Sequence, residues 1–453
     1  MSDNKHPCST QGLYGNSPVN PGNRRQIGLG PNKKHFKING HSLKYGLSVL
    51  IVWLCPVAAQ AMADLSDIFQ PYVSNTVTYI DNLFYQPKSP GLSALPNGFV
   101  FDDVMNQATV GSAVNYALGR QLFRLNLSVT DNRFVNNTFL NHISSNNRAA
   151  WNWQLGRQWS GNVGYAYSRA MGGFTNTNFY GLNIITTNNA FADLNYAWHP
   201  RWKARANLSY LEFTNSTSSR ALNNQQMLTA LVGLNYTTPS NNSTGLQYSF
   251  TDGKFPNRTL GQGSLFDNKY QQHSINALLT WKITAKTNFI GNVGYISRIN
   301  PDYSQRDYSG ETFDLTLNWT PTAKVMLALS GFHRLNSFAD VTANFILVEG
   351  FSLSPMWQVS PKLTLMAKFM YQTWDYSGDP GIPTTTALSR RQDTILNGQV
   401  SLVYTPVPNA EISLGYQGAK RNSNDTPINP ATLLPYNFDY DVNSVFCSGT
   451  LKF

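Results

Sequence analysis

The sequence predicts an all-β protein: a transmembrane, antiparallel, up-and-down β-barrel of about 18 strands, with short turns at one end and long loops at the other. Three observations predict this fold. The chain is poor in charge without being apolar. Eight turn-like segments recur along it, each after an aromatic residue. Apolar and polar side chains alternate between those turns. A barrel wall that faces lipid on one side and water on the other accounts for all three.

Composition excludes the other common classes of membrane and soluble protein. Of the 453 residues 13% are charged, whereas soluble domains usually carry about 25%. The mean hydropathy of −0.31 argues against a bundle of membrane helices. So does the lack of an apolar run of roughly 20 residues, the length that a spanning helix needs. A membrane protein of this composition is expected to cross the bilayer with strands.

Residues 1–63 are expected to form an N-terminal extension and a secretory signal peptide, and residues 64–453 the barrel. Lysines precede the apolar segment Tyr45–Ala61, and the small residues Ala61-Met-Ala63 follow it, as in a signal peptide with its cleavage site. A membrane anchor is the alternative, and Pro56 and the short apolar core disfavour it.

Cleavage at this point also changes the charge. Residues 1–63 hold seven of the 34 basic and one of the 24 acidic residues, so the net charge falls from +10 to 27 − 23 = +4. The basic character of the full chain therefore no longer argues for a nucleic-acid partner, and none is expected. Cys447 would be the one cysteine left, so no disulfide is expected within the chain.

The eight turn-like segments lie 37 to 47 residues apart, and Trp319-Thr-Pro-Thr-Ala-Lys324 is typical of them. Proline and glycine in these segments interrupt a strand ladder. The aromatic residue before each turn falls on the apolar face of its strand, and the chain itself ends in another aromatic residue. We therefore predict an aromatic girdle at one membrane interface. Its members are Tyr116, Trp153, Trp198, Tyr236, Trp281, Trp319, Trp357, Tyr404 and Phe453.

Between the turns the side chains alternate with a period of two. In Trp202–Leu211, for example, apolar and polar residues alternate over about ten residues, which is enough to cross a bilayer when the strand is tilted. Two strands per turn give 16 strands, and the additional pair Val73–Phe84 and Asp102–Tyr116 gives 18, with 16 as the fallback. A soluble β-sandwich is the alternative, but its strands are usually shorter.

The connections at the other end are longer and polar, for example Asp131–Asn146 and Asp375–Arg390. Short periplasmic turns and long outer loops are typical of outer-membrane barrels. The last strand ends in Phe453, and this ending resembles the terminal signal that the barrel-insertion machinery reads. The expected location is the outer membrane of a Gram-negative cell, with that machinery and the membrane lipid as partners.

The face opposite the apolar one should line the lumen, because a barrel of sixteen or more strands leaves an aqueous channel. Seven basic and four acidic side chains are assigned to this face, a net charge of +3, together with many Asn and Gln. Such a wall offers hydrogen bonds and a mild preference for anions. The charged residues are Arg124, Arg148, Asp193, Lys203, Arg205, Asp314, Lys324, Arg334, Lys368, Asp393 and Glu411.

One segment carries a family resemblance. Val77-Thr-Tyr-Ile-Asp-Asn-Leu-Phe84 resembles the opening Tyr-x-Asp-Asn-Leu-Phe strand of the EpsL family, and Arg306-Asp-Tyr308 and Trp319–Lys324 are also similar. EpsL-like proteins are outer-membrane barrels from exopolysaccharide-biosynthesis loci, often associated with exosortases. The resemblance implies a role in exopolysaccharide biosynthesis or export, with a polysaccharide and periplasmic export components as partners. Asp81 and Asn82 are expected to have a structural role at the end of the strand.

Two other functions stay open beside export. A general or sugar-selective porin for small-solute uptake would need the same polar lumen, and an adhesin would use the long outer loops. An enzyme is not expected. The triplet His142-Ile-Ser144 resembles the His-x-Ser constellation of outer-membrane phospholipases, but it lies in a segment predicted as a loop, without an orienting partner. No cofactor and no metal site are expected.

Overall fold

The computed structural model describes residues 68–87, 99–175, 179–258, 268–302, 304–337, 345–377, 391–424 and 437–453. The predicted extension and signal peptide, residues 1–63, lie outside this range. Within the described part of the chain, no helix is long and apolar enough to cross a membrane. Among the described residues, the regular structure consists of strands and of three 3₁₀ turns, which lie at Thr138–Leu140, Ser218–Asn223 and Ser304–Arg306.

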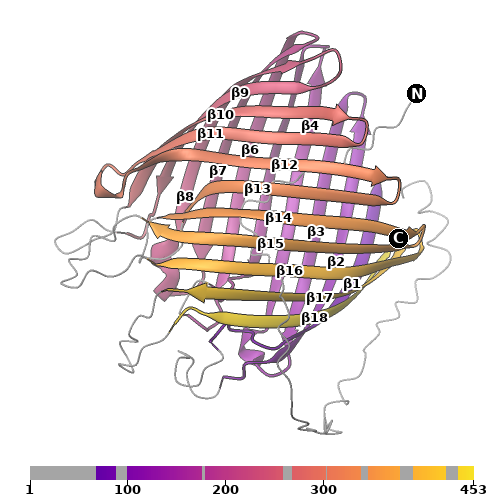
Figure 1. The fold of residues 1–453 in the computed structure, drawn as a ribbon, viewed down its shortest axis with the longest axis vertical. Coiled ribbons are helices and arrows are strands. Elements are labelled where there is room, and N and C mark those ends of the chain that lie inside the picture. Colours follow the sequence, from indigo (N-terminus) through magenta and orange to yellow (C-terminus); the bar gives the residue numbers. More distant parts are fainter. Residues whose placement is uncertain are drawn as a thin grey trace.

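Eighteen antiparallel strands form one closed sheet, because β1 pairs with both β2 and β18. In Figure 1 the orange and yellow strands form the near wall, and the purple strands of the far wall pass behind them. The strands are β1 Phe69–Ile80, β2 Asp103–Leu118, β3 Gln121–Phe134, β4 His142–Leu155, β5 Trp159–Met171, β6 Ile184–His199, β7 Trp202–Asn215, β8 Gln225–Thr237, β9 Ser243–Lys254, β10 Lys269–Thr284, β11 Thr287–Ile299, β12 Tyr308–Thr322, β13 Val325–Ser337, β14 Phe345–Ser360, β15 Leu363–Ser377, β16 Gln392–Val407, β17 Ala410–Ser423 and β18 Tyr440–Lys452.

The predicted fold class is confirmed, with 18 strands and not the fallback of 16. Each of the eight predicted turns joins two neighbouring strands at the same end of the barrel. The turns between β2 and β3 and between β4 and β5 use Gly119 and Gly156, whose φ values are 60° and 63°. Glycine adopts this left-handed conformation without a steric cost, which suits a tight hairpin.

Two details differ from the sequence prediction. The first strand was expected over Val73–Phe84, but β1 ends at Ile80. The chain turns there because the Asn82 side chain binds both the backbone N–H (2.9 Å) and the carbonyl (2.7 Å) of Gln86. The loops are also shorter than predicted: β3 continues to Phe134 and β4 begins at His142, so much of Asp131–Asn146 is strand. The strands extend beyond the part where apolar and polar residues alternate.

The outer face carries a continuous apolar band. Large apolar side chains there are widely exposed, such as Val110 (65%), Leu246 (58%) and Leu414 (55%). An exposed apolar surface that runs round a closed barrel is the surface that lipid covers. Charged outward residues, such as Arg133, Lys254 and Glu349, lie only in the strand halves near the long loops. The protein is therefore a barrel of the outer membrane.

Candidate functional site: the inner face and mouth of the barrel

Strand pairing defines a polar and an apolar face, because directly paired residues project to the same side of a sheet. Between β6 and β7, for example, Arg205 opposes Asn195, while the next residue, Ala206, opposes Leu194. The apolar face is the exposed outer one. The polar face is the inner one, and Arg421 of β17, which lies on it, reaches the carbonyl of Thr175 beyond β5, on another part of the wall.

The register places nearly all the predicted lumen residues on this inner face. They are Arg124, Arg148, Asp193, Lys203, Arg205, Asp314, Arg334, Lys368, Asp393 and Glu411. Lys324 is the exception. It lies in the turn between β12 and β13, outside both strands, because β12 ends at Thr322 and β13 begins at Val325. That the other residues line an open channel remains a prediction.

The structure brings some of these residues together and leaves others apart. Arg205 Nη2 lies 2.9 Å from Asp193 Oδ1, and Arg334 forms a forked ion pair with Asp314, with Nε 2.8 Å from Oδ1. Within each of these two ion pairs, the opposite charges cancel. Other basic residues on this face, Arg124, Lys203 and Lys368, have exposed side chains, and Arg148 stacks over the ring of Phe191 at 4.6 Å. The inner surface is therefore basic on balance.

Eight of the nine predicted girdle residues precede a short turn, and Phe453 directly follows β18; by parity they lie on the outer face of the barrel. Most are strongly exposed, from Trp281 at 41% to Phe453 at 50%, whereas Trp153 and Tyr236 are half-buried. Further aromatic residues, which the pattern before the turns does not include, pack beside them from the following strands. Trp159 stacks on Tyr196 with ring centroids 4.3 Å apart. Contact of this girdle with a membrane interface stays a prediction.

Several further charged residues of the inner face lie outside the set predicted from sequence. The strand register also places five other charged residues on this face, namely Lys282, Arg298, Arg421, Lys452 and Asp103. Strand parity identifies such residues, but the sequence predicts Lys420–Asp439, which includes Arg421, to be a loop. With these residues included, basic side chains still outnumber acidic ones on the inner face of the strands.

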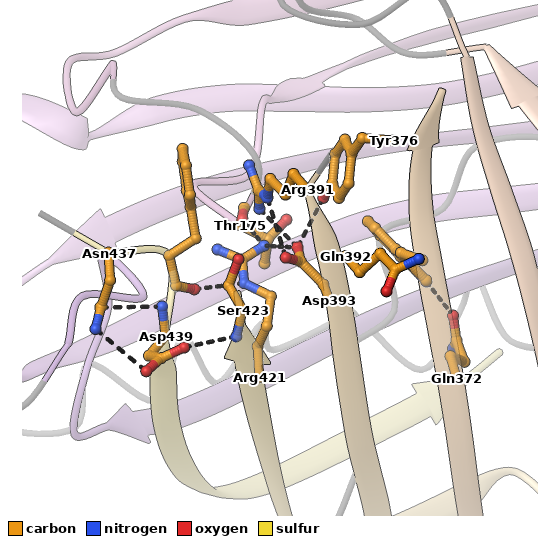
Figure 2. A network of polar contacts seen from close by, with 12 residues as sticks. Thr175, Gln372, Tyr376, Arg391, Gln392, Asp393, Arg421, Ser423, Asn437 and Asp439 are labelled. Atoms are coloured by element: carbon orange, nitrogen blue, oxygen red, sulfur yellow. Dashed lines mark hydrogen bonds and ion pairs between the residues drawn. The ribbon is translucent and has the colours of Figure 1, made fainter. Parts of the chain in front are cut away.

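A buried polar network lies on the inner face at the loop end of β15–β17 (Figure 2). Asp393 is its centre, with a side chain that is 0% exposed. Arg391 donates to both of its carboxylate oxygens, at 3.0 and 2.6 Å, and the Tyr376 hydroxyl donates to Oδ2 at 2.9 Å. Arg421 Nη1 lies 3.6 Å from the same oxygen. One carboxylate thus holds two guanidinium groups in place.

Arg421 connects this network to the loop that follows β5. Its Nη1 donates to the carbonyl of Thr175 at 2.6 Å, and its Nε donates to the carbonyl of Phe438 at 2.5 Å. The side chain is 2% exposed and lies over the Tyr440 ring at 4.6 Å. Since β17 and β5 are separated by β18 and β1–β4 around the wall, this contact narrows the mouth of the barrel.

The segment after β1 fills another part of the mouth. Phe84 is fully buried, and its ring centroid lies 4.9 Å from that of Phe174 and 6.0 Å from that of Tyr180. Asp81 accepts hydrogen bonds from the backbone and side chain of Asn443 on β18. Burial, and then the neighbouring Tyr440, raises the pKa of the Tyr85 phenol, which therefore stays neutral. Asp81 and Phe84 thus hold this segment against the wall.

Asp103 secures the connection between β3 and β4. This 1%-exposed carboxylate accepts backbone N–H bonds from Val135, Asn136 and Asn137 at 2.9–3.0 Å, and one from the Asn137 side chain. Several N–H donors around one carboxylate compensate its loss of solvation. The rim is therefore ordered by buried carboxylates at two separate positions.

His142 and Ser144 lie in β4, so the prediction that they belong to a loop is wrong. His142 Nδ1 contacts the carbonyl of Leu140 at 2.7 Å, and the Ser144 hydroxyl accepts from Asn132 at 2.9 Å. These contacts do not join nucleophile and base. Among the described residues, no group of three His, Cys, Asp or Glu side chains could hold a metal ion.

Comparison with known proteins finds similar folds only. No protein-family model and no curated protein match the chain. Among solved structures, outer membrane protein OpdK of Pseudomonas aeruginosa is 11% identical, with a TM-score of 0.46 over 85% of this chain and 100% of that one. OccK3 (OpdO) of the same organism is 12% identical, with a TM-score of 0.46 over 87% of this chain and 99% of that one. Likeness of this degree assigns neither a family nor a substrate.

Proposed function

We propose that the protein is a passive outer-membrane channel for small hydrophilic solutes, with a mild preference for anions. The observation that carries the proposal is the basic, polar inner face of an 18-stranded barrel. Barrels of this size are too wide for side chains to fill and leave an aqueous passage. Exposed Arg124, Lys203 and Lys368 would attract anions into that passage.

The mouth favours small solutes over a thick polymer. The Arg421–Thr175 contact and the packed side chains around Phe84 occupy part of the opening on the loop side. Fixed, buried groups of this kind restrict the size of what enters. Solutes that pass between them then meet a wall of amide and guanidinium groups with which they can exchange hydrogen bonds.

Ion selectivity in a planar bilayer tests this function. The purified barrel should pass anions about twice as readily as cations at 0.1 M salt, and less selectively at 1 M, where the Debye length falls from about 10 Å to about 3 Å. The double variant Arg124→Glu, Lys368→Glu should shift the reversal potential toward zero, because it lowers the net charge of the inner face by four. The matched control is the double variant Arg133→Glu, Lys254→Glu. It makes the same charge change on the outer face and should leave the reversal potential unchanged. Equal effects of both double variants, or no conductance, would contradict the proposal.

A second candidate is passage of an exopolysaccharide, which the EpsL-like segment Val77–Phe84 favours. Deletion of the gene should then lower the amount of secreted polymer and leave growth on small solutes unchanged. Polymer assays on culture supernatants measure this directly. Full polymer secretion combined with impaired small-solute uptake would instead favour the porin-type channel.

A further inference from the structure

A shallow recess of about 390 Å³ lies in the inner wall at the short-turn end of β4–β6. Amide and hydroxyl side chains line it: Asn152 and Gln154 from β4, Ser160 and Asn162 from β5, and Asn195 from β6. The register sets these side chains in two adjacent rows. Asn152 opposes Asn162 in one row, and Gln154, Ser160 and Asn195 oppose one another in the other. Neighbouring members of a row are about 4.8 Å apart, the spacing of adjacent strands.

Two polar atoms of this recess are buried and unsatisfied. Asn152 Nδ2, a donor, and Asn162 Oδ1, an acceptor, have no hydrogen-bond partner within the part of the chain that the structure describes. Buried amide groups are normally hydrogen-bonded, since an unmade bond leaves the cost of desolvation uncompensated. One of these groups needs an acceptor and the other needs a donor, and both belong to directly paired residues.

Two charged residues, Arg120 and Asp193, border the amide side chains of the recess. Arg120, at its edge, donates to the carbonyl of Gly156 at 2.6 Å. Asp193, which opposes Asn162, is bound by Arg205 at 2.9 Å and by Asn207 at 3.1 Å. Beside Arg120, Leu122, Trp153 and Gly161, the lining consists of neutral amides and a hydroxyl. Because these amide and hydroxyl groups are both donors and acceptors, a neutral ligand with hydroxyl groups could donate to them and accept from them at once.

We propose that this recess, which we call the amide recess, is a binding subsite for uncharged polyhydroxylated solutes, that is, for sugars. Adjacent hydroxyl groups of one sugar ring would bridge Asn152 and Asn162, and the next ring along a chain would meet Ser160 and Asn195. The proposal rests on the channel function and names a solute class for it. The same chemistry serves an imported oligosaccharide and an exported polysaccharide.

Maltotriose and maltoheptaose are suitable probes for the full barrel in a planar bilayer and, independently, for calorimetric titration of the detergent-solubilised barrel. Both sugars should interrupt the current and release or absorb heat on binding. Asn152→Ala and Asn162→Ala should each weaken sugar affinity by about three- to tenfold, the effect of one or two lost hydrogen bonds. Gln399→Ala is the matched control, because it removes an amide from the inner face on β16, away from the recess, and should leave the affinity unchanged.

The outcomes separate this proposal from the channel function itself. An open channel with no sugar-dependent current block or heat would overturn the sugar subsite and leave the channel function standing. Loss of affinity in Gln399→Ala equal to that in the asparagine variants would also overturn it. So would tighter binding of glucuronate than of neutral sugar, because the subsite would then recognise charge. A dependence of the block on chain length and on the side of addition distinguishes an exported polymer from an imported oligosaccharide.

Discussion

Replacing Asp393 with asparagine is expected to lower the free energy of unfolding by about 3–5 kcal/mol, the usual cost of removing one partner from a buried ion pair. Asparagine has nearly the same shape, so the loss would come from charge. Arg391 and Arg421 would remain buried beside each other without the carboxylate between them. The urea midpoint of the barrel refolded into lipid vesicles measures this effect.

The same variant should also loosen the mouth. Arg421 holds the carbonyl of Thr175, and its own position depends on Asp393. Backbone amides near Phe174 should therefore exchange hydrogen faster in Asp393→Asn than in the parent protein. Asp314→Asn is the matched control, because that aspartate also pairs with an arginine on the inner face but its side chain is 41% exposed. Solvent screening limits that pair to roughly 1 kcal/mol or less. Equal destabilisation by the two variants would show that burial of Asp393 is not what matters.

The wall of the barrel was predictable from sequence because its two faces meet different surroundings. Alternation along strands such as β7 and the aromatic residue before each turn follow directly from lipid on one side and water on the other. This pattern identified all eight turns and the strand number. The alternating pattern ends where the strands extend beyond the apolar band. There β3 and β4 continue as strands without an apolar outer face, and the segment was predicted as a loop.

The mouth was less predictable, because its contacts join segments far apart in sequence. Strand parity assigned Asp393 to the inner face. The sequence around Asp393 does not indicate that Arg421 is its partner, or that Arg421 contacts Thr175. Asp81 and Asn82 were expected to be structural, and the structure shows how: one binds Asn443 on β18, and the other folds the chain back onto Gln86. Register relates neighbouring strands, whereas these contacts depend on how loops enter the barrel.

The assignment of the two faces leads to a second large expected effect. Leu246→Arg should lower the free energy of unfolding by roughly 2–4 kcal/mol, because it places a guanidinium on the outer face within the apolar band. Leu246 is 58% exposed and is paired with Leu234 and Ala277, both apolar. The side chain cannot reach a counter-charge there without distorting the bilayer. Urea titration in vesicles, followed by tryptophan fluorescence, measures the loss.

The next residue along β9 provides the control. Gln247 projects to the inner face, where it is paired with Gly233 and Asn276. Gln247→Arg adds the same group one position away, in contact with water instead of lipid, and should change stability by less than about 1 kcal/mol. Because neighbouring positions of a strand differ only in the face they occupy, the difference between the two variants isolates the environment of that face. Similar losses in both would mean that the inner face near β9 is not hydrated, which would remove the basis for a channel through this barrel.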